Sequence, residues 1–144
     1  MTALVPAFVE EIPEELSADT LYVSVVYRTT AHLCCCGCGH EVVAPLSPTD
    51  WSITFDGVSV SLSPSIGNWN FPCRSHYWIV DGQVRWARPW TDREIRAGRA
   101  RDTVAKNRYY STTQLGPPVD VVTNEPWRVA RKGSWLRPGR RSTR

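Results

Sequence analysis

The sequence lacks several features that would place the protein in a familiar class. No apolar run reaches the roughly 18 residues of a membrane-spanning helix. The first residues carry a cluster of glutamates instead of the basic and apolar regions of a secretory signal. Phosphate-binding loops, the H-E-x-x-H motif and dinucleotide fingerprints are also missing. These absences predict a cytoplasmic protein and disfavour nucleotide-dependent enzymes and helical zinc proteases.

Acidic residues are missing from the C-terminal 17 residues, although the chain as a whole is nearly balanced. The 144 residues are 42% hydrophobic and 22% charged, which is typical of one globular domain. Residues 128–144 hold seven of the 17 basic groups, so the rest of the chain is mildly acidic. We therefore predict a solvated basic tail at 109–144 and no stable binding of nucleic acid near physiological salt.

The five cysteines are the most informative feature of the composition. An odd number in an expected cytoplasmic chain argues against a disulfide framework. Four of them fall within five residues, and the fifth precedes a histidine by three positions; they are Cys34, Cys35, Cys36, Cys38 and Cys73. Such a cluster favours a metal site over incidental free thiols.

Short β-branched and aromatic runs predict a mainly β fold. They cover residues 20–28, 40–44, 51–56, 58–63, 76–80 and 83–87. Asp56-Gly57 and Asp81-Gly82 separate two pairs of these runs and predict antiparallel hairpins. Thr91 and Glu94 form a capping box that opens one helix, expected to reach about residue 108.

The predicted fold is therefore a small antiparallel β domain with hairpins, stapled by zinc, plus one C-terminal helix. Residues 1–19 are expected to be an acidic tether, residues 20–108 the metal-binding domain with its helix, and residues 109–144 an irregular basic tail. Five tryptophans are expected to lie in the core rather than on a base-stacking surface; they are Trp51, Trp69, Trp78, Trp86 and Trp90.

The spacing of the cysteines leaves several ligand sets open. Cys36-x-Cys38 with Cys73-x-x-His76 supplies three sulfurs and one imidazole, a set that zinc binds tetrahedrally. Cys35-x-x-Cys38 with the same second pair is an alternative knuckle. An iron–sulfur cluster is a third possibility, although Rieske loops carry one cysteine and one histidine each, and the first loop has no histidine at the matching place.

These residues also carry a resemblance to a family of small bacterial proteins. Its motifs are CPCGCG, P-S-[IV], C-x-S-H-[FY]-[FW]-I and G-x-[VI]-x-W. They correspond to CCCGCG at residues 34–39, PSI at 64–66, CRSHYWI at 73–79 and GQVRW at 82–86, and the similarity covers about residues 32–87. The family motif has proline at the position of Cys35, which implies that Cys35 is not a ligand.

The resemblance implies a component of a bacterial ubiquitin-like conjugation operon, beside E1-like and E2-like proteins. It implies a peptidase or deconjugase that acts on a ubiquitin-like modifier. The rival hypothesis is a non-enzymatic zinc-binding interaction module of the same pathway.

Five candidate groups compete for a four-coordinate site once Cys35 is set aside. If Cys34 is spare, His76 is a ligand and the closed site is structural. If His76 is spare, the ligands are Cys34, Cys36, Cys38 and Cys73, and a free imidazole lies close to the metal.

A free His76 could act as general base to a serine nucleophile. Ser65, in the P-S-I motif, is the preferred nucleophile and Ser63 the reserve. Ser75 fits badly, because adjacent residues of a strand point to opposite faces. Asp50, Asp56 and Asp81 are the candidates for a third member that orients His76.

Overall fold

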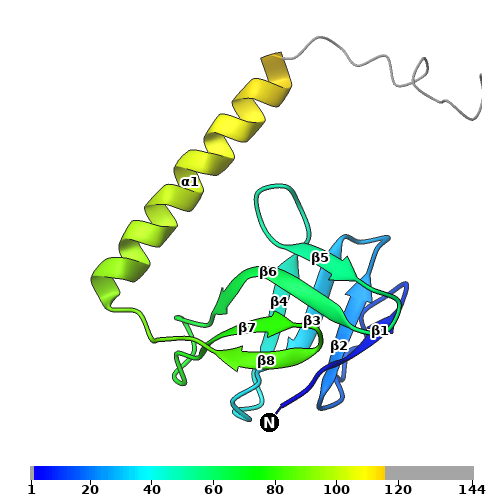
Figure 1. Ribbon diagram of the computed structural model, residues 1–144. Helices are drawn as coiled ribbons and strands as arrows, with labels where there is room; N and C mark the ends of the chain where they lie inside the picture. The colour runs from blue at the N-terminus through cyan, green and yellow to red at the C-terminus, as the bar shows by residue number, and fades with distance from the viewer. Residues whose placement is uncertain (1, 116–144) are drawn as a thin grey trace, which may run out of the picture. The chain divides into compact units, whose positions relative to one another are not determined.

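The computed structural model describes residues 2–115, and residues 1–107 form a compact unit of two four-stranded sheets and the first part of a helix (Figure 1). The first sheet has the order β1 (Val5–Phe8), β2 (Thr20–Ser24), β3 (Thr29–Leu33), β4 (Glu41–Pro45). The second has the order β5 (Ser52–Phe55), β6 (Val60–Gly67), β7 (His76–Val80), β8 (Gln83–Trp86), and α1 (Asp92–Leu115) follows. All pairings are antiparallel except β1 with β2. The mainly β fold with one C-terminal helix is thus confirmed.

Both predicted Asp-Gly hairpins are present. Asp81 and Gly82 join β7 to β8, and both have the positive φ that a two-residue turn of this kind needs (50° and 74°). Asp56 lies between β5 and β6, where its carboxylate accepts hydrogen bonds from the backbone N–H groups of Val58 and Ser59 at 2.8 and 2.6 Å. These turns fix the register of the sheet that carries Ser65 and His76.

The core lies between the two sheets and follows from alternation along the strands. Leu21 and Val23 of β2 are fully buried, as are Tyr77 and Ile79 of β7. Each such aliphatic side chain stabilises the fold by about 1.5–3 kcal/mol. A polar contact crosses the same core, because the Tyr77 hydroxyl lies 2.7 Å from Nε2 of the buried His32.

The N-terminal segment differs from the tether that we expected at residues 1–19. β1 pairs in parallel with β2, and Leu4 before it is 4% exposed and belongs to the core. The backbone N–H of Leu4 donates to the Gly82 carbonyl at 2.7 Å. The physical reason is that Leu4, in the apolar run at residues 3–9 before the glutamates, gains by burial, while the backbone of β1 pairs with β2.

The helix begins at the predicted capping box but ends later than residue 108. The Thr91 N–H donates to the Glu94 carboxylate at 2.7 Å, and the Glu94 N–H donates to the Thr91 hydroxyl at 3.2 Å. α1 then continues to Leu115, so the first residues of the predicted irregular tail are helical. Within the described chain, no helix is both long and apolar enough to cross a membrane. The basic residues at 128–144 lie outside the described residues.

None of the five tryptophans predicted to lie in the core is fully buried. Trp78 is 40% exposed, because it pairs with Arg85 on the outer face of the β7–β8 hairpin. Trp86 pairs with Tyr77 and contacts its ring at the end of β8, but it is still 56% exposed. Trp51, Trp69 and Trp90 are half-buried and line a pocket instead.

Candidate functional site

Four of the five cysteines meet at one point and form what we term the cysteine cluster (Cys34, Cys36, Cys38 and Cys73). Their Sγ atoms all lie within 4.8 Å of one another. The first three come from the turn between β3 and β4, where Gly37 and Gly39 adopt φ values of 86° and 82° that other residues rarely adopt. The turn can therefore direct three sulfurs toward Cys73, which comes from the loop before β7.

The spacing of these sulfurs fits a single tetrahedral metal ion. A tetrahedron with metal–sulfur bonds of about 2.3 Å has edges of about 3.8 Å. The Sγ–Sγ distances are 3.4 Å for Cys34–Cys36, 3.9 Å for Cys34–Cys73 and 3.8 Å for Cys38–Cys73. All are far longer than the roughly 2.05 Å of a disulfide, and all five cysteines are free. The donor set therefore fits a closed Cys₄ site.

Cys35 lies apart from the cysteine cluster. It is half-buried and packs against the hydrophobic core. Burial raises the pKa of its thiol to about 11. A neighbouring histidine contacts the cysteine cluster, because His40 Nδ1 lies 3.2 Å from Cys38 Sγ. The His40 ring also stacks on Phe71.

Ser65 and His76 meet on the face of the second sheet that points away from the core. Ser65 Oγ lies 2.9 Å from His76 Nε2. Gly67 of β6 is paired with His76 of β7, so Ser65, two residues earlier on the same face, is the diagonal neighbour of His76. Ile66 and Tyr77 alternate with them and point into the core. A register shift between Leu62 and Ile66 spans the P-S-I motif, and such bulges change where a side chain points.

The hydrogen bonds of His76 define its tautomer. Nδ1 lies 2.6 Å from the carbonyl oxygen of Arg88, which can only accept, so Nδ1 carries the proton. In the neutral imidazole, Nε2 is then the unprotonated nitrogen and accepts the hydrogen of the Ser65 hydroxyl. This is the state that a histidine needs in order to take a proton from serine.

A backbone carbonyl, and none of the three predicted aspartates, orients His76 in the described chain. Asp50 accepts from Ser47 and pairs with Lys106, and Asp56 belongs to the β5–β6 turn. Asp81 contacts Ser61. Sequence reasoning missed the role of Arg88 because every residue has a carbonyl group, and only the fold determines which carbonyl faces the ring.

Aromatic side chains enclose the imidazole. Trp69 and Trp90 stack at 5.6 Å with an interplanar angle of 20°, and their ring centres lie 5.0 and 5.3 Å from that of His76. Gly67 makes room for this arrangement, since a Cβ there would lie 2.4 Å from Nε1 of Trp69. His76 is consequently only 7% exposed.

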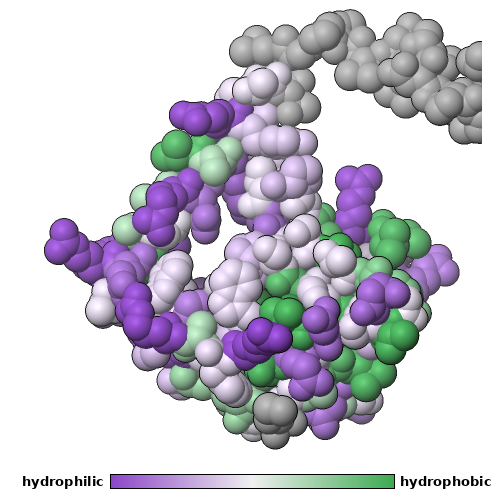
Figure 2. Space-filling view, viewed as in Figure 1, coloured by the Kyte–Doolittle hydropathy of each residue, from purple (hydrophilic) through white to green (hydrophobic). Residues whose placement is uncertain are grey.

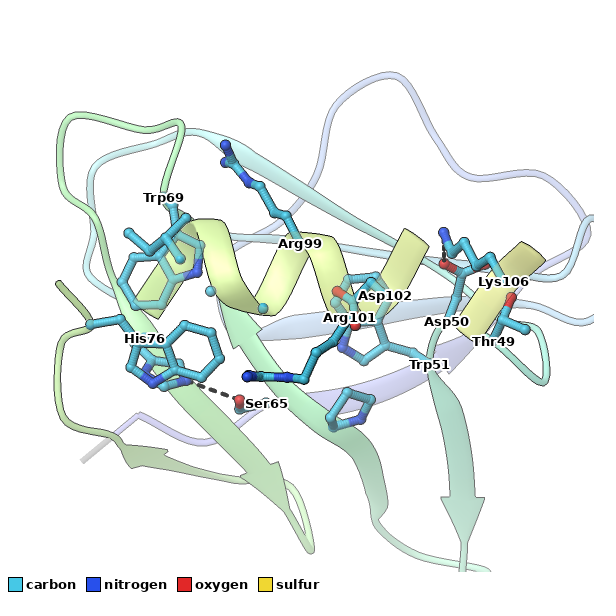
Figure 3. Close-up of a pocket in the computed structure, with 15 residues that line it drawn as sticks. Thr49, Asp50, Trp51, Ser65, Trp69, His76, Arg99, Arg101, Asp102 and Lys106 are labelled. Carbon is cyan, nitrogen blue, oxygen red and sulfur yellow. Dashed lines mark hydrogen bonds and ion pairs between the residues drawn. The ribbon is translucent and has the colours of Figure 1, made fainter. Parts of the chain in front are cut away.

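Ser65 and His76 open onto a pocket of about 410 Å³ (Figure 3). Strand residues and the Trp69–Trp90 pair form one wall. Residues 95–106 of α1 form the other wall, with Ile95, Gly98, Arg99, Arg101, Asp102 and Lys106. The pair of Ser65 and His76, which we term the dyad, is therefore open to a substrate on one side and shielded by indole rings on the other.

Two buried polar residues connect the cysteine cluster with the dyad. Ser75 Oγ lies 3.1 Å from Cys34 Sγ and accepts from the Asn68 side-chain amide at 2.9 Å. The backbone N–H of Asn68 donates to the Ser75 carbonyl at 2.8 Å, beside the Gly67–His76 pair. The ends of β6 and β7 that carry the dyad are thus held at the cysteine cluster.

This combination of a serine hydroxyl, a correctly protonated histidine and an adjoining pocket is the nucleophile–base arrangement of serine hydrolases. Residues 8–87 match the family model described as bacterial ubiquitination-like system serine protease (BubE), and the chain belongs to this family. The matched region contains the cysteine cluster, Ser65 and His76. Searches of curated proteins and of solved structures give no match.

Proposed function

We propose that this protein is a zinc-stabilised serine peptidase that matures or removes a ubiquitin-like modifier in a bacterial conjugation pathway. The observation that carries the proposal is the 2.9 Å contact between Ser65 Oγ and His76 Nε2 at the edge of an open pocket. The family match supports the reaction class and the pathway.

Acylation of Ser65 is the first half of the proposed reaction. Ser65 Oγ attacks the carbonyl carbon at the modifier's C-terminal junction while its proton moves to His76 Nε2. The carbonyl π pair moves to the oxygen, which becomes negatively charged. When the carbonyl re-forms, the bond to the amine breaks, and the amine leaves with the proton from Nε2. The modifier remains attached to Ser65 as an ester.

Water completes the reaction by hydrolysing this ester. His76 takes a proton from water, and the oxygen attacks the ester carbonyl. Collapse of the second tetrahedral intermediate returns the proton to Ser65 Oγ and releases the modifier with a free carboxylate. The hydrogen bond from Nδ1 to the Arg88 carbonyl keeps the imidazole ring in its orientation throughout the reaction. The carbonyl takes the place that the aspartate carboxylate has in a Ser-His-Asp triad. Backbone N–H groups near Gly67 are candidate oxyanion donors.

The cysteine cluster would hold zinc as a structural ion. Four thiolates close the coordination sphere, so the ion supplies folding energy and presents no open position to substrate. One tetrahedral ion accounts for sulfurs that all lie within 4.8 Å of one another, whereas a two-iron cluster distributes its four thiolates over two metals. Zinc is therefore favoured over the iron–sulfur alternative.

The proposed partners are the modifier itself and the E1-like and E2-like proteins of the same pathway, with the cytoplasm as the compartment. Nucleic acid has no part in the proposal, because residues 1–127 hold 14 acidic against 10 basic groups. The partner assignments rest on the pathway that the family description names.

Incubation with the ubiquitin-like precursor encoded in the same operon tests the proposal. We expect the precursor to be cut at one position near its C-terminus, seen by intact-mass spectrometry, and Ser65→Ala to abolish the cut. Ser63→Ala is the matched control, because Ser63 is exposed and lies two residues away in β6. Cleavage by Ser65→Ala at the wild-type rate would rule out Ser65 as the nucleophile. A precursor that the wild-type protein leaves intact would favour the non-enzymatic zinc-binding module.

A further inference from the structure

The pocket contains one cation that is not engaged by any other described residue. Three basic side chains of α1 line it. Lys106 Nζ pairs with Asp50 at 2.7 Å, and Arg99 Nη2 donates to Asn70 Oδ1 at 2.9 Å. The guanidinium of Arg101 has no hydrogen bond or ion pair with any residue in the described part of the chain, including its acidic neighbour Asp102.

The Arg101 side chain is directed at the reacting group. Figure 3 shows it extending from α1 across the pocket, with its guanidinium end toward Ser65. Asp102 lines the same wall and has no ion pair with a residue of the described chain. Lys106 and Asp50 neutralise each other. With Arg99 included, the charged pocket residues have a net positive charge that would favour an anionic oxygen beside Ser65.

Arginine has the chemistry that such an oxygen requires. Its guanidinium stays protonated at all working pH values and presents several N–H donors in one plane. Hydrogen bonds from it to an anionic oxygen are about twice as strong as neutral ones. The same group has little to gain from a neutral amide or ester carbonyl, so the interaction strengthens as negative charge develops.

We propose that Arg101 binds the oxygen that becomes negative on the carbon attacked by Ser65. That oxygen is the oxyanion of the tetrahedral intermediates and one carboxylate oxygen of the released acid product. The inference rests on the proposed function, and it assigns to α1 a role in the reaction. Arg101 lies beyond residues 8–87, so the part of the chain that matches the family does not include it.

A kinetic comparison tests the effect on the intermediate. Arg101→Gln should lower kcat for precursor cleavage at least about tenfold with little change in KM, the order expected when one charge-assisted hydrogen bond is lost. Arg101→Lys should recover part of the rate, because the charge remains but the planar fork is lost. Arg96→Gln is the matched control: it removes one exposed arginine of the same helix that does not line the pocket, and kcat should stay within about twofold of wild type.

A binding experiment gives a readout that does not depend on cleavage. In the Ser65→Ala background, the mature modifier with a free C-terminal carboxylate should bind at least about tenfold more tightly than the same protein ending in a carboxamide. Adding Arg101→Gln should abolish this preference, and adding Arg96→Gln should preserve it. Higher salt should weaken the preference, because the arginine is exposed at the pocket.

The outcomes separate the two proposals. If wild-type protein leaves the precursor intact, the proposed function is wrong, whatever the binding data show. If wild type cleaves but Arg101→Gln keeps kcat within about twofold, or if the carboxylate preference survives Arg101→Gln or is absent from the Ser65→Ala parent, the role of Arg101 is overturned and the peptidase remains.

Discussion

Cys34 and Ser75 lie 3.1 Å apart, Sγ to Oγ, although 41 positions separate them in the chain. Ser75 immediately precedes His76, and the alternation of β7 directs the two side chains to opposite sides of the sheet. The cysteine cluster therefore contacts one face of this strand end, while the dyad occupies the other. A change in the cysteine cluster that moves Ser75 would therefore also move His76, the next residue in the chain.

The first prediction concerns metal content. The purified protein should contain about one zinc per chain, and chelation should lower Tm markedly, because ligand binding energy is folding energy in small metal domains. Cys73→Ser should lose the metal or express poorly. Cys35→Ala is the matched control and should keep the metal, because Cys35 lies outside the cysteine cluster. A well-folded, metal-free Cys73→Ser protein would contradict the structural role, and a brown protein would indicate iron–sulfur.

The second prediction separates the roles of His76. His76→Ala should abolish cleavage yet retain the metal, because His76 contacts Ser65 and the Arg88 carbonyl while four cysteines complete the cluster. Losing a nucleophile or its base typically costs several orders of magnitude in rate. Elemental analysis beside single-turnover kinetics would measure both effects. Metal loss in His76→Ala, with Cys34→Ser still loaded, would restore the mixed cysteine–histidine site.

The third prediction follows from the contact between Cys34 and Ser75. Ser75→Ala removes the hydroxyl that lies against Cys34 and leaves the Asn68 amide without its 2.9 Å acceptor. Loss of an outer hydrogen bond to a metal ligand typically costs 10- to 100-fold in affinity or activity, so we expect about that effect on zinc affinity and a fall in kcat.

Competition with a chromogenic chelator measures the affinity, and zinc saturation tests whether the rate recovers. Ser61→Ala serves as the control, since Ser61 contacts Asp81 at the far end of β6. Unchanged zinc affinity in Ser75→Ala would show that the contact between Ser75 and Cys34 contributes nothing to the free energy of zinc binding.

The fourth prediction concerns the carbonyl that orients His76. The Arg88 guanidinium makes two hydrogen bonds to Glu94, at 3.2 and 2.8 Å, and these bonds lower the pKa of Glu94 to about 2 together with the Thr91 N–H. A carboxyl group with a lowered pKa stabilises the fold above its unfolded pKa and loses this effect as the pH falls toward the folded value. The bonds should therefore hold through the neutral and mildly acidic range.

Glu94→Gln should loosen the Arg88 segment and lower kcat several-fold with metal content unchanged. Asp92→Asn, which also removes a carboxylate from the first turn of α1 but pairs with Arg74, should not. Equal rates for both variants would show that the Arg88 carbonyl is held by its backbone alone.

Local sequence patterns predict most of the second sheet and the start of the helix. The Asp-Gly turns and the Thr91–Glu94 box act through residues two or three positions apart, so the sequence contains the whole interaction. The patterns do not indicate β1 or β3, and the strand expected at residues 20–28 divides into β2 and a turn. In that turn Arg28 has a φ of 52°, a conformation that its residue type does not announce.

The sequence by itself determined that this is a mainly β protein with a cysteine-rich site. It also indicated Ser65 as a candidate nucleophile and His76 as its candidate base. Five possible ligands for four positions could not be reduced from spacing, because spacing does not say which sulfur or nitrogen faces inward. The fold brings Cys34 within 3.9 Å of Cys73 and turns His76 to the other face of β7, which supports the all-cysteine set of the proposal. It also supplied the Arg88 carbonyl, the tryptophan enclosure and the α1 wall with Arg101, all of which depend on contacts between segments distant along the chain.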